Sequence, residues 1–469
     1  MSLNIQSAEQ IQIVSVRLES PKRYFGGRDN QSFLLAGQDP TGKMSSPTVL
    51  EFVFYENIAK PFITGELLLL DQHDLISITN IKGTEKIIIE YRDPGSEFGI
   101  VRKDFVITSI KSRSHVSDGE ALTSIELIED FGYFNFITNI NKGYSGKGEQ
   151  IIDKIGLSEI GKTYKKDYFK ESYQTPFTYV APHVNPYAAI SDILSNITTK
   201  NGMPFFYYST ISSKEAIFTD LESIIERGSF NSGAPLKYSI ENVSSPDDDL
   251  LNKVLIVDGY EATNMANSSS LANLGGIGSE IQIVDPTTSS EVAVQKTFLD
   301  MKKVMDNLQE DVVGRNQKIV NIDYISRFLD TPQADKPLQD YNSKVSVFFN
   351  DANVDQSTSN ETNGFNQNNI EDLKLQNIKN AILAHLTFEA VKIAAPGLLF
   401  GTNSILTTVG NLVDFQFNNF TADVDDRVDA KRSGQFLILQ KRHSINLIDN
   451  LHTVGIKMSK VSDLKPRER

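Results

Sequence analysis

The sequence predicts a mixed, β-dominated fold: two similar β-barrel domains, an α+β domain, and an inserted domain that contains a helix. Three observations predict it. Segments rich in β-branched and aromatic residues lie toward both ends of the chain, helical patterns lie between them, and one strand–turn–strand pattern occurs twice. With 469 residues the chain is long enough for roughly two to four domains.

The composition excludes several classes of function. The chain carries 46 Lys and Arg against 60 Asp and Glu, a net charge of −14, so it lacks the excess of cations that wrapping nucleic acid requires. It has no cysteine, which removes disulfides and thiolate chemistry and is typical of assembly in a reducing compartment. No apolar run approaches the ~18 residues of a membrane-spanning helix. Residues 1–12 have no signal-peptide pattern, so we expect no membrane insertion.

The first barrel is predicted at residues 1–135, where short strand-like segments follow one another closely. Such spacing favours an all-β barrel or sandwich. Asp93-Pro94-Gly95 and Asp118-Gly119 are turn sequences, because their residues tolerate the dihedral angles of tight turns. The predicted strands are Thr48–Tyr55, Gly65–Leu70, Glu85–Tyr91 and Asp104–Ile110.

The α+β domain is predicted at residues 136–245. Ser145–Leu157 is predicted as a short helix with three isoleucines on one face, and Asn185–Asn196 as a second helix with a proline in its first turn. The aromatic run Met203–Ser209 is predicted as a buried strand that pairs with Ala216–Thr219.

The second barrel is predicted to be discontinuous, formed by residues 246–265 and 380–463 around an inserted domain at 266–379, with a short tail at 464–469. Its first part contains the strand-like segment Asn252–Asp258.

Inside the insertion, a long amphipathic helix is predicted. Its apolar face consists of Val294, Phe298, Met301, Met305, Leu308 and Val312. Residues 351–369 are rich in Asn, Gln, Ser and Thr and bury little apolar surface, so the composition predicts a mobile loop. A helix at Ile370–His385 then leads into a β-rich block, Leu386–Asp463.

An internal repeat is the most informative feature of the sequence. Phe105–Asp130 lies over the segment that starts at Phe436 without a gap, at a constant offset of 331 residues. The turn residue Asp118 lies over Asp449, and the alternating inward positions keep the same parity in both copies. Chance similarity between two hairpins is the simpler explanation, but the coincidence of turn, parity and aromatic start favours two copies of one barrel. Two such units in each of three chains would give six near-equivalent barrels.

The two hairpin segments, together with Asn185–Thr210, resemble the baseplate central hub proteins of contractile-tailed, T-even-like bacteriophages. In Asn185–Thr210 a helix is followed by Gly-Met-Pro-Phe and an aromatic strand, as in the domain between the two tube-type barrels of that family. The resemblance covers most of 48–219 and 386–463. Residues 266–379 depart from the family pattern.

The resemblance implies a structural virion protein of the tail baseplate, assembled in the host cytoplasm, and no enzymatic activity. It implies a homotrimeric ring that adapts a sixfold tail tube to a threefold central spike and leaves a channel through which DNA passes without specific binding. The implied partners are the spike, the tail tube protein and baseplate wedge proteins. Because the sequence ends at Arg469, soon after the second barrel, we expect the form of hub whose spike is a separate chain.

The motifs that could carry chemistry do not fit known sites, so we assign no catalytic, cofactor-binding or metal residue and leave the interface residues open. Gly143–Gly148 and Gly275–Gly278 fail the spacing of phosphate-binding loops. An acidic cluster lacks the pattern of a calcium loop, and a run of three aspartates is expected to be a linker. These acidic residues are Asp423, Asp425, Asp426 and Asp429, and Asp247, Asp248 and Asp249. The six histidines show no metal-binding spacing.

Two alternatives stay open. One is the hub of a bacterial contractile injection system. The other belongs to a different class, a β-barrel accessory hydrolase or carbohydrate-binding module, for which the internal duplication has no evident use. Under the hub interpretation the channel is expected to be acidic or mixed in charge. The hairpin cations Lys111, Arg113, Lys441 and Arg442 would then face ring neighbours or the outer domains.

Overall fold

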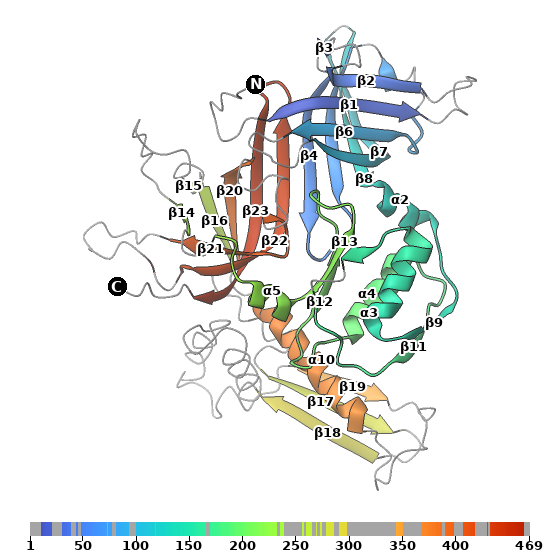
Figure 1. The fold of residues 1–469 in the computed structure, drawn as a ribbon, viewed down its shortest axis with the longest axis vertical. Coiled ribbons are helices and arrows are strands. Elements are labelled where there is room, and N and C mark those ends of the chain that lie inside the picture. Colours follow the sequence, from blue (N-terminus) through green and yellow to red (C-terminus); the bar gives the residue numbers. More distant parts are fainter. Residues whose placement is uncertain are drawn as a thin grey trace.

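The computed structural model describes the greater part of both β regions and of the region between them (Figure 1). The described residues are 11–20, 31–38, 44–45, 48–72, 74–76, 81–92, 100–117, 119–165, 169–231, 235–238, 256–257, 259–264, 269, 273, 278–285, 290–297, 344–349, 367–386, 390–397, 407–417, 429 and 432–463. Within them, no helix is both long enough and apolar enough to cross a membrane.

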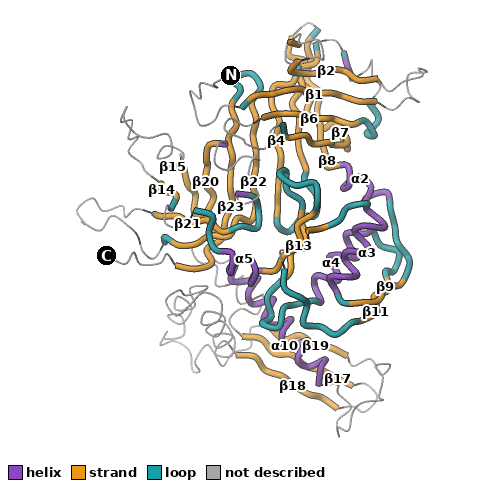
Figure 2. The backbone as a smooth tube through the Cα atoms, in the orientation of Figure 1, coloured by secondary structure: helices purple, strands orange, loops and turns teal. Residues whose placement is uncertain are grey.

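The fold is β-dominated, as the sequence predicts, and most described strands belong to one large sheet (Figure 2). The first β unit comes from the N-terminal part of the chain. Its strands are β1 (Gln12–Ser20), β2 (Gln31–Gln38), β3 (Met44–Ser45), β4 (Val49–Asn57), β5 (Thr64–Asp71), β6 (Lys86–Arg92), β7 (Val101–Ser117) and β8 (Glu120–Glu129). They pair in the order β4–β5–β8–β7–β6–β1–β2–β3. Buried and partly exposed residues alternate along β5 and β8, which is why period-two apolar patterns predicted these strands.

The second β unit comes mainly from the C-terminal part. Its strands are β14 (Leu236–Tyr238), β15 (Ile256–Val257), β16 (Gly259–Asn264), β20 (Ala390–Pro396), β21 (Leu412–Gln416), β22 (Gly434–Asn446) and β23 (Leu451–Asp463). They pair as β16–β20–β23–β22–β21, and β14 and β15 extend the sheet beyond β21. Strand β22 also pairs with β4 of the first unit, so the two units form one continuous sheet (Figure 1).

The α+β region lies between the two units in sequence. Its elements are α2 (Asp130–Ile137), β9 (Gly143–Gly146), α3 (Gly148–Ile155), the π-helical turn η1 (Gly156–Ile160), β10 (Tyr164–Lys165), β11 (Phe177–Val180), α4 (Pro186–Asn196), β12 (Phe205–Tyr208), β13 (Ala216–Asp220) and α5 (Leu221–Arg227). Helix α4 begins as predicted, because the Asn185 side chain accepts a hydrogen bond from the Ala188 N–H at 2.8 Å and Pro186 occupies the first turn. Helix α3 starts later than predicted, since Ser145 belongs to β9.

Part of the inserted region is a three-stranded sheet and a helix. The elements are β17 (Gly278–Asp285), β18 (Ser290–Thr297), β19 (Lys344–Phe349) and α10 (Gln367–Leu386). The helix predicted from Val294 onward is wrong at its start, because Val294 lies in β18, opposite Ile281 of β17. Eight consecutive residue pairs between β17 and β18 outweigh the helical spacing of the apolar residues. The rest of that predicted helix lies outside the described residues.

Helix α10 confirms the helix predicted at Ile370–His385 and begins three residues earlier, at Gln367. Residues 367–369 are therefore helical and not part of a loop, whereas residues 351–366 lie outside the described residues. Lys379 of α10 donates hydrogen bonds to the carbonyl oxygens of Leu194, at 3.3 Å, and Ser195 near the end of α4. Burial lowers the pKa of Lys379 to about 8. This contact ties α10 to the α+β region.

The described residues form three apolar cores, and the core of the second β unit also contains residues of α5 and α10. In the first β unit, Phe54 stacks on Phe105 with ring centroids 5.2 Å apart. In the second, Phe415 and Phe417 pack against Phe436. The α+β core is built around the isoleucines of α3 and α4 and the aromatic residues of β12 and β13.

Candidate functional site

The glycine-rich and acidic motifs of the sequence have structural roles wherever the structure describes their residues. Gly143 and Gly146 belong to β9, which pairs with β11, and Gly148 is the first residue of α3. A Cβ on Gly148 would lie 2.5 Å from the Ile197 side chain, so glycine is needed there for close packing. Asp429 accepts a hydrogen bond from the Arg432 N–H at 3.1 Å. Among the described residues no three His, Asp or Glu side chains are grouped to hold a metal ion. Asp423, Asp425, Asp426, Asp247–Asp249 and residues 275–277 lie outside the described residues.

The two hairpins share one register from Phe105 to Ile110 and from Phe436 to Lys441. Strands β7 and β8 align with β22 and β23 at the offset of 331, and five residue pairs coincide. In the first hairpin these pairs are Phe105↔Glu129, Val106↔Ile128, Ile107↔Leu127, Ser109↔Glu126 and Ile110↔Ile125. Their equivalents in the second hairpin, in the same order, are Phe436↔Lys460, Leu437↔Ser459, Ile438↔Met458, Gln440↔Lys457 and Lys441↔Ile456. An irregularity in the ladder falls at the same place in both, between Ile107 and Ser109 and between Ile438 and Gln440. The sequence repeat is thus also a structural repeat.

The strands that flank the hairpins are equivalent too. Thr64 of β5 lies opposite Ile128, and Ala390 of β20 lies opposite Ser459, the residue equivalent to Ile128. Lys86 of β6 lies opposite Val106, and Leu412 of β21 lies opposite Leu437, the residue equivalent to Val106. Strands β4 and β16 complete the match, since they pair with β5 and β20. Each unit therefore contains the same run of strands, β4–β5–β8–β7–β6 or β16–β20–β23–β22–β21.

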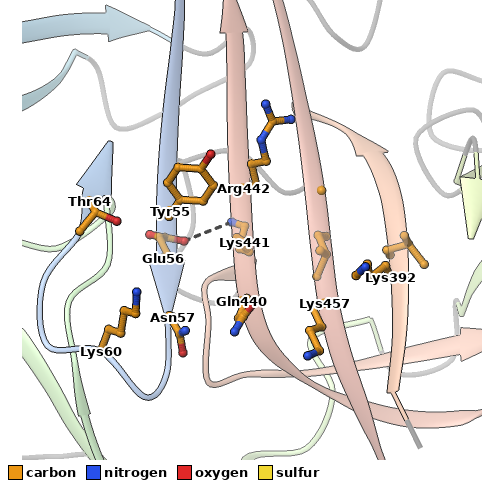
Figure 3. A pocket seen from close by; sticks show the side chains of 13 residues that line it. Tyr55, Glu56, Asn57, Lys60, Thr64, Lys392, Gln440, Lys441, Arg442 and Lys457 are labelled. Atoms are coloured by element: carbon orange, nitrogen blue, oxygen red, sulfur yellow. Dashed lines mark ion pairs between the residues drawn. The ribbon is translucent and has the colours of Figure 1, made fainter. Parts of the chain in front are cut away.

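The joint between the two units is the antiparallel pair β4–β22. It spans seven residue pairs, from Gln440↔Asn57 to Asn446↔Glu51. Figure 3 shows the part of it around Glu56 and Lys441. Beneath it, Lys441 and His443 of β22 meet Glu56 of β4, and all three are fully buried. The Lys441 ammonium lies 3.8 Å and the His443 Nε2 atom 3.4 Å from a Glu56 carboxylate oxygen. Lys441 also donates to the Thr407 carbonyl at 3.1 Å.

The charge state of this cluster follows from its contacts. Burial acts to raise the pKa of Glu56, but Lys441, the hydrogen bond from His443 and the Ile211 N–H outweigh it and hold the pKa at about 2. Burial, and then Lys441, lower the pKa of His443 to about 4. A neutral His443 that donates to Glu56 through Nε2 accepts at Nδ1, 3.1 Å from Nε2 of His452. The cluster therefore joins a buried carboxylate and a buried ammonium to a His443 that is neutral at neutral pH.

The sequence contained a signal for this cluster that spacing rules for catalytic motifs do not detect. Glu56 continues the inward parity of Phe52 and Phe54, and Lys441 and His443 share the parity of Ile445. A charged residue at an inward strand position indicates a buried partner.

A loop of the α+β region is fixed under the same joint. The Ile211 N–H donates to Glu56 at 2.5 Å. Lys103 of β7 donates to the carbonyl oxygens of Thr210 and Ser213, at 3.1 and 2.8 Å. Lys162 bridges Glu129 of β8 and the Ser209 hydroxyl at 2.8 and 2.6 Å. The described part of the α+β region is thereby bonded to the core-side face of the sheet, which leaves the opposite, open face uncovered by it.

The open face of the sheet carries a concave cationic patch, defined here as Lys60, Lys392, Arg442 and Lys457, around a cavity of about 550 Å³ (Figure 3). Lys392 pairs with Glu261 at 3.4 Å. The other three cations of the patch have no carboxylate partner among the described residues.

The four hairpin cations have different surroundings. Lys111 bridges Glu66 and Glu126 at 2.7 and 2.9 Å at the surface. Arg113 pairs with Asp74 at 2.5 Å and Asp71 at 3.4 Å. Lys441 is buried in the joint, and Arg442 projects into the cationic patch on the open face. The expected contacts of these cations with ring neighbours stay a prediction.

No family model matches the sequence, and no curated protein matches it. Several solved structures are similar in fold. A tail protein from Neisseria meningitidis matches with a TM-score of 0.48 and 10% identity, over 96% of this chain and 97% of its own. A prophage tail protein from Shewanella oneidensis matches with a TM-score of 0.47 and 10% identity, over 95% and 98%.

A component of the E. coli type VI secretion system, itself described as similar to bacteriophage tail proteins, matches with a TM-score of 0.40 and 12% identity, over 91% of this chain and 78% of its own. All three TM-scores are below 0.5, and about one residue in ten is identical.

Proposed function

We propose that the chain is the structural hub of a contractile-tail baseplate. In this proposal it forms a homotrimer whose six β units make a pseudo-hexameric ring. The ring joins a sixfold tail tube to a threefold central spike and leaves a channel for DNA. The role is architectural and needs no catalytic residue.

The observation that carries the proposal is the common register of the two hairpins. Five paired positions and one ladder irregularity repeat at a single offset, so the chain holds two copies of one unit. The joint β4–β22 already places these copies edge to edge in one sheet. A tandem of like units joined at their edges is suited to a ring in which the number of units is twice the number of chains.

The proposal also assigns the domains. Residues 1–135, and residues 246–265 with 380–463, would form the ring, and residues 136–245 and 266–379 would lie outside it, except for β14, which pairs with β21 and β15 in the second unit. The sequence resemblance supports the spike, the tail tube protein and baseplate wedge proteins as partners, in the tail of a virion assembled in the host cytoplasm. The contacts of Ile211, Lys103 and Lys162 support the outer position of the α+β region, because they attach it to one face of the sheet and leave the other face open.

Electron microscopy of the purified full-length chain tests this function. We expect ring-shaped particles that show six similar lobes in end view and contain three chains. Particles that contain a single chain, or rings whose lobe number is not twice the number of chains, would refute the hub. As a control, Glu66→Ala changes an exposed ion pair outside the joint and should give the same rings.

A further inference from the structure

The sheet that passes through both units has two strands that, within the described part of the chain, lack a neighbour on one side. The run is β16–β20–β23–β22–β4–β5–β8–β7. At one end β16 pairs with β20, and among the described strands it pairs with no other. At the other end β7 pairs with β6 only over Val101–Val106, so from Ser109 to Ser117 β8 is its single partner among the described strands.

The free edge of β7 is long and exposed. Residues 110–117 are exposed throughout, and they include two apolar side chains, Ile110 at 36% and Val116 at 62% exposure. Unpaired N–H and C=O groups along such an edge are a template for another strand. In β22 the equivalent segment is covered by β4, and its residues Lys441, His443 and Ile445 are buried.

The joint inside the chain supplies the geometry for covering the free edge. Strand β22 is equivalent to β7, and β4 is equivalent to β16. A contact between the free edges of β7 and β16 would therefore be equivalent to the pair β4–β22. The register can be transferred as well. A further irregularity between Ile110 and Ser112, absent from β22, shifts β7 by one residue relative to the offset of 331. Ser114 therefore corresponds to Ser444, and the two lie opposite the equivalent residues Leu122 and Thr453. Val53 and Glu261 lie opposite the equivalent residues Glu66 and Lys392. Since Ser444 lies opposite Val53 in the joint, Ser114 corresponds to a position opposite Glu261.

We propose that β7 of one chain pairs antiparallel with β16 of a second copy, with Ser114 opposite Glu261 of that copy. This inference rests on the proposed function and names the surface that closes the ring. The two ends are complementary and not alike, so the contact is head-to-tail, and such contacts repeat until they close. Each β unit would then contact a like unit on both sides, one through the β4–β22 joint within the chain and the other through the β7–β16 contact between chains.

The charges at the two ends agree with this pairing. The free segment of β7 carries Lys111, Arg113 and His115 and no acidic residue. On β16 the described side chain is that of Glu261, which is 68% exposed. Strand edges of opposite charge are favoured over edges of like charge, so the cations of the β7 segment and Glu261 support β16 as the partner of β7.

Disulfide trapping tests the contact directly, because the chain has no cysteine of its own. The double variant Ser114→Cys with Glu261→Cys places one thiol at each end of the sheet. Directly opposed residues of antiparallel strands have Cα atoms ~4.5–5.5 Å apart, within the range a disulfide spans. Mild oxidation should yield a covalent trimer on a non-reducing gel, which a reductant returns to single chains.

Two matched variants calibrate the experiment. Val53→Cys with Ser444→Cys places the same pair in the intrachain joint and should oxidise without forming oligomers. Ser195→Cys with Glu261→Cys moves one thiol to the exposed end of α4 and should give no specific trimer. The solution mass of each variant is measured in parallel.

The outcomes separate the inference from the function on which it rests. If the mass is that of a trimer and the joint pair oxidises, but the Ser114–Glu261 pair gives no covalent trimer, the strand pairing is wrong and the hub proposal stands. A single-chain mass overturns both. A covalent ladder that continues beyond three chains contradicts a closed ring of three.

Discussion

The hairpins β7–β8 and β22–β23 share a register over five residue pairs, and the outer edges of β7 and β22 have opposite surroundings. In the second hairpin, β4 covers the outer edge, and a buried Lys441, His443 and Glu56 cluster lies beneath the contact. In the first hairpin the corresponding edge is exposed, and its cations Lys111 and Arg113 form ion pairs at the surface. One hairpin therefore shows this edge covered by a neighbouring strand, and the other shows the same edge without a neighbour among the described strands.

The cores of the two hairpins should be equally sensitive to truncation. Phe105→Ala and Phe436→Ala remove equivalent, fully buried rings, and each should lower the free energy of unfolding by about 3–5 kcal/mol. Urea titrations monitored by circular dichroism measure both effects. If one variant costs less than about 1 kcal/mol while the other unfolds the protein, the two hairpins are not equivalent in their packing.

The joint should depend on its buried carboxylate. Glu56→Ala leaves the Lys441 ammonium buried without its counter-charge and should cost about 3–5 kcal/mol, measured by urea titration. Glu66→Ala is the matched control, because it removes a carboxylate that pairs with Lys111 at the exposed surface, and it should leave the unfolding midpoint close to that of the wild type. If both substitutions lowered the free energy of unfolding equally, the buried carboxylate of the joint would be no more important to stability than the exposed one.

The joint should also weaken in acid. The folded pKa of His443, about 4, lies below its ordinary value of 6.5, so the unfolded chain binds a proton that the folded chain does not, and stability falls from about pH 6.5 to 4. The loss from this group is about 3 kcal/mol at most. Glu56, with a folded pKa of about 2 against 4.5, adds a further loss between pH 4.5 and 2.

Melting temperatures recorded across this pH range measure the effect. His443→Gln should flatten the profile between pH 6.5 and 4, because it removes the group that titrates there. A variant profile that parallels the wild type throughout would mean that other groups carry the pH dependence.

Much of the fold could be predicted because its signals are local. The alternation in β5 and β8, the Asn185 cap and Pro186 of α4, and the gapless repeat all lie within short stretches of sequence. Strand β18 could not be predicted in this way. Its conformation depends on pairing with β17, whereas the spacing of its own apolar residues favours a helix. The Glu56–His443 contact joins residues 387 positions apart, so no local spacing could bring them together.

The smallest expected effect concerns DNA. The open face carries Lys60, Arg442 and Lys457 without carboxylate partners among the described residues, but strand parity places Glu51, Glu66 and Glu126 on the same face. With this mixed charge and a net charge of −14, the chain should show no measurable affinity for duplex DNA at physiological salt. A fluorescence titration checks this. Micromolar or tighter binding that weakens steeply with salt would show that the cationic patch dominates the face.

The mass of the purified chain in solution tests the central claim, that two like units per chain assemble three at a time. Size-exclusion chromatography with light scattering should give about 157 kDa, three times the chain mass of 52.3 kDa. The value should hold on dilution to low micromolar concentration, since a closed ring leaves no free edge of β7 or β16. A stable particle of one chain mass, at micromolar concentration, would contradict the account.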